Sequence, residues 1–271
     1  MPYRIHPDNR GRISPIHFIL VLMLSFIAGT GVFYAGAAQA GQWRVTPIRV
    51  NFERGARIGT VNVRNDGDTP MNFQVKAMAW TQDTEGKDRY EETNELIFFP
   101  KLLAIPPHEE RVIRIGLRGP GGGAKEKTYR LYVEEVSPPR KDPNAGGATV
   151  AVNVRFAVPL FVCPTKEELG GQLEKTELDK GTVKAFVRNT GNKHFRVTSL
   201  QFKGKNAKGE ETFSQSMDGW YVLNGVTRAF SMPVPHDACG KTDLIEVRIS
   251  TDREIRSEEH TSELQSLRTI S

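Results

Sequence analysis

The sequence has little of what several classes of protein require. Only two of its 271 residues are cysteines, Cys163 and Cys239, which are too few for a disulfide-dense scaffold or a four-thiolate zinc site. Its 25 glycines and 16 prolines follow no period, which excludes a collagen-like or low-complexity chain. The net charge is +5, and the basic residues form no block with interleaved aromatics. The sequence therefore gives no indication of nucleic-acid binding.

Motifs for catalysis are also missing. The one glycine-rich stretch, residues 118–127, lacks the Gly-Lys-Ser/Thr ending of a phosphate-binding loop. His108, His194 and His236 are isolated from one another, without the paired spacing that zinc hydrolysis needs. No G-x-S-x-G nucleophile elbow occurs. Although a triad can form from residues distant in sequence, these observations favour a binding protein without metal or cofactor over an enzyme.

Residues 1–40 have the pattern of a secretory signal peptide. Three arginines among the first twelve residues precede an uncharged apolar run at residues 18–27, and small residues follow up to an Ala-Gln-Ala ending. A retained membrane anchor is the alternative, because the stretch 18–34 is nearly long enough to span a bilayer. Interspersed glycines favour cleavage. We therefore expect an exported mature chain that begins at Gly41 and is not inserted in the membrane.

The remainder of the chain has the pattern of an all-β protein. Short runs that alternate apolar and polar residues, such as 57–64 and 128–136, are separated by Gly, Pro, Asn and Asp. A polar, glycine-containing break at 164–170 is the best linker. The pattern predicts two β-sandwiches in tandem, at residues 41–163 and 171–253. Both contain a strand that ends in Arg-Asn-x-Gly, which either shared turn chemistry or duplication explains.

The C-terminal residues 254–271 differ from the rest. They are polar, lack alternation and look like the translation of a sequencing adapter. A natural disordered tail is the alternative. If the segment is not native, we expect the second sandwich to lack its last strand and to expose a sheet edge.

Five segments of the chain resemble the periplasmic chaperones of the chaperone–usher pilus pathway. In order, these segments are residues 46–52 (TPIRVNF), 61–65 together with Trp80, 99–114, 129–136 and 155–162. The last two are closest to the archaic or alternative branch. The resemblance spans nearly all of 41–253. It implies two immunoglobulin-like domains in a boomerang arrangement and a periplasmic protein that binds, folds and caps pilus subunits and delivers them to an outer-membrane usher.

The resemblance also implies how a subunit is bound. The last strand of the first domain is lent to a subunit that lacks one strand, which is donor-strand complementation. Val150, Val152, Val154 and Phe156 share one face of that strand, and each would contribute about 1.5–3 kcal/mol when fully buried. The alternative is that this face fills the chaperone's own core.

Basic residues that hold the subunit's C-terminal carboxylate are a further implication of the resemblance. Arg49 occupies the position of the first anchor, and an arginine suits this task because its planar fork binds a carboxylate bidentately. Pro159 stands where the best-known members have a lysine, so the second anchor has to come from elsewhere. Arg155 and Arg130 are the candidates, and exposed strand charges are the alternative interpretation of both.

Export bears on the two cysteines as well. In an oxidising compartment a lone pair often closes into a disulfide, so Cys163 and Cys239 are a candidate bridge. Two unpaired thiols are the alternative, and the sequence does not decide between them because it does not give their separation.

The function predicted from the sequence is therefore that of a periplasmic chaperone for pilus subunits, without enzymatic activity. A secreted structural or adhesive sandwich, such as a pilus subunit, is the first alternative. Residues 43–52 argue against it, because they have the pattern of a folded first strand and not of a disordered donor extension. A secreted hydrolase is less favoured, since the histidines are scattered.

Overall fold

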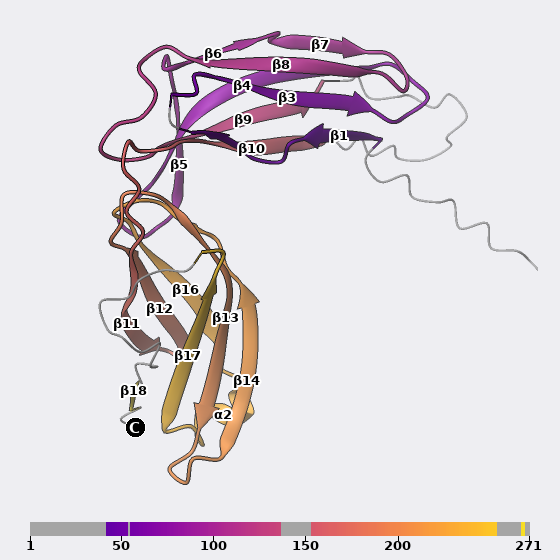
Figure 1. Cartoon of the computed structure of the whole chain (residues 1–271). Helices are drawn as coiled ribbons and strands as arrows, with labels where there is room; N and C mark the ends of the chain where they lie inside the picture. The colour runs from indigo at the N-terminus through magenta and orange to yellow at the C-terminus, as the bar shows by residue number, and fades with distance from the viewer. Residues whose placement is uncertain (1–41, 54, 137–152, 254–266, 269–271) are drawn as a thin grey trace, which may run out of the picture. The chain divides into compact units, whose positions relative to one another are not determined.

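The computed structural model describes residues 42–53, 55–136, 153–253 and 267–268 of the chain. These residues form two β-sandwiches of two sheets each, as the sequence predicts (Figure 1). The predicted signal peptide at 1–40 lies outside the described residues, as do Val150 and Val152.

The first sandwich is built from two sheets of mainly antiparallel strands. One sheet has the order β1-β3-β8-β6, with β1 (Trp43–Thr46), β3 (Ile58–Asn65), β8 (Glu110–Leu117) and β6 (Leu96–Phe99). The other has the order β2-β10-β9-β4-β5, with β2 (Val50–Phe52), β10 (Arg155–Val162), β9 (Lys127–Glu135), β4 (Met71–Gln82) and β5 (Asp88–Glu92), while β7 (Leu102–Ile105) also pairs with β4. The pairing of β2 with β10 is parallel.

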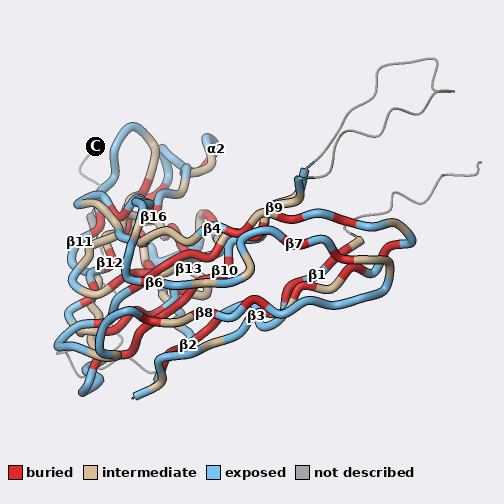
Figure 2. The backbone as a smooth tube through the Cα atoms, turned by 90° about the horizontal axis from the view of Figure 1, so that it is seen from above, coloured by how far each residue is buried: buried red, intermediate tan, exposed pale blue. Residues whose placement is uncertain are grey.

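Alternation along the strands places the core of the first sandwich between its sheets. On β3 the residues Val61 and Val63 are buried and their neighbours are more exposed, and Ile113 and Ile115 on β8 follow the same rule. Figure 2 shows the buried stretches along these strands. A side chain of this size contributes about 1.5–3 kcal/mol when buried, so the two-residue period sets the register of the sheets.

The second sandwich repeats this plan with fewer residues. Its first sheet has the order β11-β12-β16, with β11 (Gly171–Asp179), β12 (Thr182–Asn189) and β16 (Thr227–Pro233). Its second has the order β14-β13-β17-β18, with β14 (Glu211–Asp218), β13 (Phe195–Lys205), β17 (Leu244–Thr251) and β18 (Leu267–Arg268), and β15 (Tyr221–Val222) pairs with β13. The single turn α2 (His236–Cys239) follows β16. Phe195, Leu200 and Phe202 are fully buried in the core between these sheets.

The turn after β3 depends on the buried side chain of Asn65. Its Nδ2 donates to the carbonyl oxygens of Thr69 (2.8 Å), Ile105 (3.1 Å) and Pro106 (3.1 Å). Its Oδ1 accepts the backbone N–H of Gly67 at 2.9 Å. One amide side chain therefore satisfies the backbone groups of two connections that would otherwise be buried without partners.

Asn189 does the same in the second sandwich. Its Nδ2 donates to the carbonyl oxygens of Lys193 and Val222, both at 2.9 Å, and its Oδ1 accepts from Gly191 N at 2.9 Å. The Arg-Asn-x-Gly likeness in the sequence is thus the same turn chemistry, repeated at Asn65 and Asn189.

The edge of β17 is paired over a short length. β13 covers one side of β17, and on the other side the described part of the chain contributes β18, which lies opposite Leu244 and Ile245. Two residues of the predicted tail therefore pair with the edge at which a last strand was expected to be missing.

The candidate disulfide is not formed in the structure, which has the alternative of two unpaired thiols. Cys163 and Cys239 are both free thiols. Cys163 N donates to Phe52 O at 3.0 Å, so Cys163 is held in the first sandwich. Cys239 lies on α2, after the end of β16 that pairs with Thr182. The strand β11 has nine residues and runs from the linker to the end of the second sandwich at which Cys239 lies, a length of about 27 Å. A disulfide needs Cα atoms within about 7 Å of each other.

We expect Asn65→Ala and Asn189→Ala each to destabilise its sandwich by about 1–3 kcal/mol, because each leaves buried carbonyl groups without a donor. Chemical denaturation followed by tryptophan fluorescence measures the change. Asn72→Ala, at an exposed position of β4, is the matched control. Equal midpoints for all three variants and the parent would contradict the role of these turns.

We also expect the two thiols to differ in reactivity. Burial raises the pKa of the Cys163 thiol, and Cys239 is exposed, so iodoacetamide should modify Cys239 in the native protein and Cys163 only after unfolding. Mass spectrometry of the intact protein counts the added groups. Two thiols that both stay unmodified in denaturant until a reductant is added would reveal a disulfide instead.

Candidate functional site

The strand β10 has one open edge over much of its length. On one side it pairs with β9 from Arg155 to Val162. On the other side it pairs with β2 only through Leu160, Phe161 and Val162. Within the described ranges, no strand covers the β2 side of β10 at residues 155–159. The main-chain groups there are a place where a further strand can add.

The apolar face of β10 changes from buried to exposed along this open edge. Val158, Leu160 and Val162 are buried in the core of the first sandwich. Phe156 is 37% exposed and Val154 is only partly buried. The strand therefore begins outside the core and ends inside it, and all five side chains lie on the same face.

Phe156 is held at this boundary by Trp43 of β1. The two rings meet edge to face, with centroids 4.6 Å apart, and Trp43 contacts Phe73 of β4 in the same manner at 4.6 Å. Of the predicted donor-strand residues, the structure thus shows Val154 and Phe156 packed against the first sandwich, at its open end. Val150 and Val152 lie outside the described residues.

The opposite face of the same sheet brings two of the predicted anchors into one row. Pro159 pairs with Arg130 on β9, and Leu160 pairs with Val50 on β2. Val50 and Leu160 point into the core. Arg49, Pro159 and Arg130 therefore share the other face, with Arg49 and Arg130 two strands, or about 10 Å, apart.

The third candidate, Arg155, lies further along this face. It pairs with Glu134, and its guanidinium lies 4.9 Å from the centroid of the Tyr132 ring. Four residues along a strand correspond to about 13 Å, so Arg155 is displaced from the row that contains Pro159. Arg49 is partly exposed, and its Nη1 lies 3.9 Å from Asp252 Oδ2, which is a long contact.

Arg130 is the unusual member of the row because it is buried. It is 5% exposed, and its guanidinium carbon lies 3.8 Å from the centroid of the Trp80 ring. Nη1 donates to Ala157 O at 3.2 Å. Nε and Nη2 are buried without a hydrogen-bond partner. The interpretation of Arg130 as an exposed strand charge is therefore wrong: the aromatic residues around the strand bury it.

Three residues beside Arg130 were not anticipated from the sequence. Trp220 and Tyr221 have rings whose centroids lie 5.8 and 5.6 Å from the guanidinium carbon. Asp88 Oδ2 accepts the Trp220 indole N–H at 2.9 Å. Burial and the Asp88 carboxylate raise the pKa of Tyr90 to about 12, although Arg130 opposes them, so this neighbouring hydroxyl stays protonated at neutral pH. The one feature of the sequence that could have indicated an aromatic surrounding for Arg130 is the adjacent pair Trp220-Tyr221.

His194 is buried and structural. Its Nδ1 and its backbone N–H contact Glu126 Oε2 at 2.7 and 2.9 Å, and its ring stacks on Phe161 with centroids 3.7 Å apart. His108 is exposed and lies beside Asp68.

In the part of the chain that the structure describes, no group of three His, Cys, Asp or Glu residues has a metal-binding arrangement. A helix that is long and apolar enough to cross a membrane is likewise not found there.

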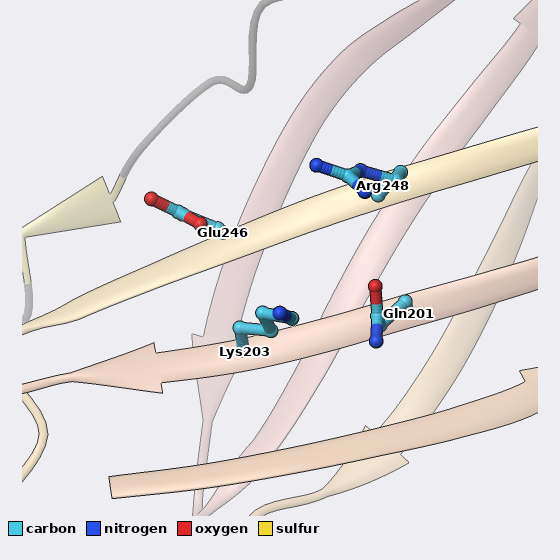
Figure 3. A pocket seen from close by; sticks show the side chains of 4 residues that line it. All are labelled: Gln201, Lys203, Glu246 and Arg248. Atoms are coloured by element: carbon cyan, nitrogen blue, oxygen red, sulfur yellow. The ribbon is translucent and has the colours of Figure 1, made fainter. Parts of the chain in front are cut away.

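A small hollow lies on the outside of the second sandwich. Gln201 and Lys203 of β13 and Glu246 and Arg248 of β17 line it (Figure 3). Glu246 forms an ion pair with Lys205. All four lining side chains are polar, whereas ligand sites are lined mainly by apolar and aromatic side chains, so the hollow is not typical of a ligand site.

The sequence of residues 42–168 matches the family model of the pili and flagellar-assembly chaperones, PapD N-terminal domain. No curated protein matches the chain.

Solved structures show the same fold. One is the CsuC–CsuE chaperone–tip adhesion subunit pre-assembly complex from archaic chaperone–usher Csu pili of Acinetobacter baumannii, with 21% identity, a TM-score of 0.56, and coverage of 81% of this chain and 100% of that chain. Another is the Salmonella enterica SafA pilin in complex with the SafB chaperone, with 16% identity, a TM-score of 0.50, and coverage of 86% and 99%.

Proposed function

The chain belongs to the pili and flagellar-assembly chaperones through its PapD-type N-terminal domain at residues 42–168, and we propose that it binds pilus subunits along the open edge of β10. The family predicted from the sequence is confirmed, and its members are chaperones and not enzymes. The alternatives of a pilus subunit and of a secreted hydrolase are left without support.

The open edge of β10 is the observation that carries the proposal. A subunit strand placed beside residues 155–159 makes main-chain hydrogen bonds with groups that have no strand partner in the described structure. Pro159 fits this position, because proline is tolerated at strand edges.

The apolar face of β10 supplies the second part of the proposal. Phe156 and Val154 continue the face that fills the chaperone's own core, and Val150 and Val152 have the same parity in the sequence. We propose that these four residues fill the gap in a subunit that lacks one strand. Specificity then comes from alternate side chains, and the folding of the subunit on the lent strand supplies the free energy without a nucleotide.

We propose that Arg49 and Arg130 hold the carboxylate at the subunit's C-terminus. Both lie on the face opposite the core and in the row of Pro159. Arg155 lies too far along the strand to share one carboxylate with them and is better placed to contact the subunit's main body.

We propose that the protein acts in the periplasm after residues 1–40 are removed, and that it delivers the bound pilus subunit to an outer-membrane usher. A separate surface is available for the usher on the outer face of the sheet β1-β3-β8-β6. Ile58, Ile97, Phe99 and Val112 are 45–74% exposed there, and Ile97 and Ile58 both pair with Gly116. Clustered exposed apolar side chains of this kind mark interaction surfaces.

Co-expression of the full chain with a pilus subunit in a bacterial periplasm tests the first part. We expect Phe156→Asp to lower the yield of soluble one-to-one complex at least about tenfold, because one buried apolar side chain contributes about 1.5–3 kcal/mol. Leu178→Asp, which makes the same kind of change at an equally exposed apolar position on β11 of the second sandwich, is the matched control. Arg49→Ala should lower the yield as well, and Arg44→Ala should not.

Thermal melting of each variant alone shows that it is folded. Equal rescue of the subunit by Phe156→Asp and by the parent would place the binding groove elsewhere. A parent that forms no complex would overturn the proposed function.

For the second part, we expect the double variant Ile97→Ser and Phe99→Ser to form the subunit complex normally and to assemble few pili. The variant removes apolar area from the proposed usher surface without changing β10. Leu178→Ser on β11 is the control for loss of an exposed apolar side chain. Pilus counts by electron microscopy and purification of the complex give the two readouts, and normal pili from the double variant would rule this surface out.

A further inference from the structure

The guanidinium of Arg130 has one edge unpaired inside the protein. Nη1 donates a hydrogen bond to Ala157 O at 3.2 Å, whereas Nε and Nη2 are buried and have no hydrogen-bond partner. The Nε–H group and one Nη2–H group lie in the guanidinium plane and point in the same direction, and they form the edge that a carboxylate binds bidentately. A buried cation with this edge free is unfavourable until an anion arrives.

Aromatic side chains surround the guanidinium: the rings of Trp80, Tyr221 and Trp220 lie beside its central carbon, and the hydroxyl of Tyr90 is also close to it. Trp80 lies against the guanidinium at 3.8 Å and is 1% exposed, so it is a fixed wall. Trp220 lies further away, at 5.8 Å, and is 39% exposed. Because Trp220 has solvent on one side, it is the ring that can move away without disturbing a core.

One hydrogen bond holds the indole side chain of Trp220, whereas its backbone carbonyl accepts separately from Val197 N. Its Nε1–H donates to Asp88 Oδ2 at 2.9 Å. The carboxylate of Asp88 is itself fixed, because Gln82 Nε2 donates to Oδ1 at 2.9 Å and Arg228 Nη1 lies 3.5 Å from the same oxygen. Gln82 in turn donates from Nε2 to the carbonyl oxygen of Tyr221 at 3.0 Å, next to Trp220. The indole is thus tied to a rigid acceptor by one bond that is open to water.

We propose that Trp220 is a gate over Arg130, held closed by Asp88, and that it opens to admit a carboxylate to the Nε–Nη2 edge. The proposal rests on the proposed function, in which Arg130 is one of the anchors for the subunit's C-terminus. It adds that the anchor is covered in the free chaperone. Only a carboxylate that competes with the Trp220–Asp88 bond gains access to it.

The gate also gives a selection by charge. An approaching carboxylate meets the negative charge of Asp88 near the entrance and the positive charge of Arg130 behind it. A neutral group, such as a peptide amide, has nothing to gain from uncovering Arg130, because it cannot form the charge-assisted bidentate pair. The ligand class is therefore a carboxylate, from a chain terminus or from an Asp or Glu side chain.

The test uses the full chain and synthetic peptides with the sequence of a pilus subunit's C-terminal strand. One peptide ends in a free carboxylate, one ends in an amide, and a third ends in an amide after an added Glu. Association and dissociation rates are measured by stopped-flow fluorescence for the parent, Trp220→Ala, Trp220→Phe and Asp88→Asn. Arg89→Ala, an exposed arginine next to Asp88 in sequence, is the matched control.

We expect Trp220→Ala to raise the association rate of the acid peptide about tenfold, the factor that corresponds to one lost hydrogen bond to a charged acceptor. Trp220→Phe keeps an aromatic ring but not the N–H, so it should show most of the same gain. Asp88→Asn keeps an acceptor and removes the charge, and should show a smaller gain. The rates of the amide peptide should be the same in all variants.

The outcomes separate the gate from the anchor. If acid and amide peptides bind the parent equally, Arg130 does not hold a carboxylate and both proposals fail at this site. If the parent prefers the acid peptide and the Trp220 variants bind it at the parental rate, the anchor stands and the gate is wrong. Binding of the Glu-amide peptide at the rate of the acid peptide would assign the site to acidic side chains as well as chain ends. A lower rate assigns it to the terminus alone.

Discussion

The structure of this chaperone depends on the two-residue period of β10. The period places Val154, Phe156, Val158, Leu160 and Val162 on one face, so the chaperone's core and the surface proposed for the subunit are continuous. Slippage by one residue would turn the whole face outward. The buried half of the strand, with its pairing to β9 and β2, therefore determines where the exposed half points.

The other face of β10 has a different role. Phe161 lies between the rings of Trp80 and His194, and His194 is bound to Glu126. Pro159 lies in the row between Arg49 and Arg130. One strand thus supplies a hydrophobic core on one side and a row of charged and aromatic groups on the other. Because both faces are used, a substitution in β10 affects more than one interface, and experiments on the binding surface are better placed at its exposed end.

Local patterns in the sequence were sufficient for the fold class and for the turns at Asn65 and Asn189, because alternation and turn chemistry act over a few residues. They were not sufficient for Cys163 and Cys239, since the length of the second sandwich separates these residues by a distance that no local pattern records. The burial of His194 could not be predicted either, because its partner Glu126 is 68 residues away in the sequence. Arg130 was placed on the right strand, but its burial depends on Trp80 and Trp220, which come from other parts of the chain.

An unpaired guanidinium in the interior requires an explanation. Evolutionary replacement of Arg130 by an apolar residue would remove a buried charge, and such replacements are often neutral or stabilising. The structure around it is not loose, since Trp80 is fully buried and Asp88 is fixed by two further donors. A rigid surrounding suits an anion site, because the reorganisation on binding is then confined to the movement proposed for Trp220. In the proposed function, the cost of this buried, partly unpaired charge in the free protein is offset when the carboxylate of a subunit binds it.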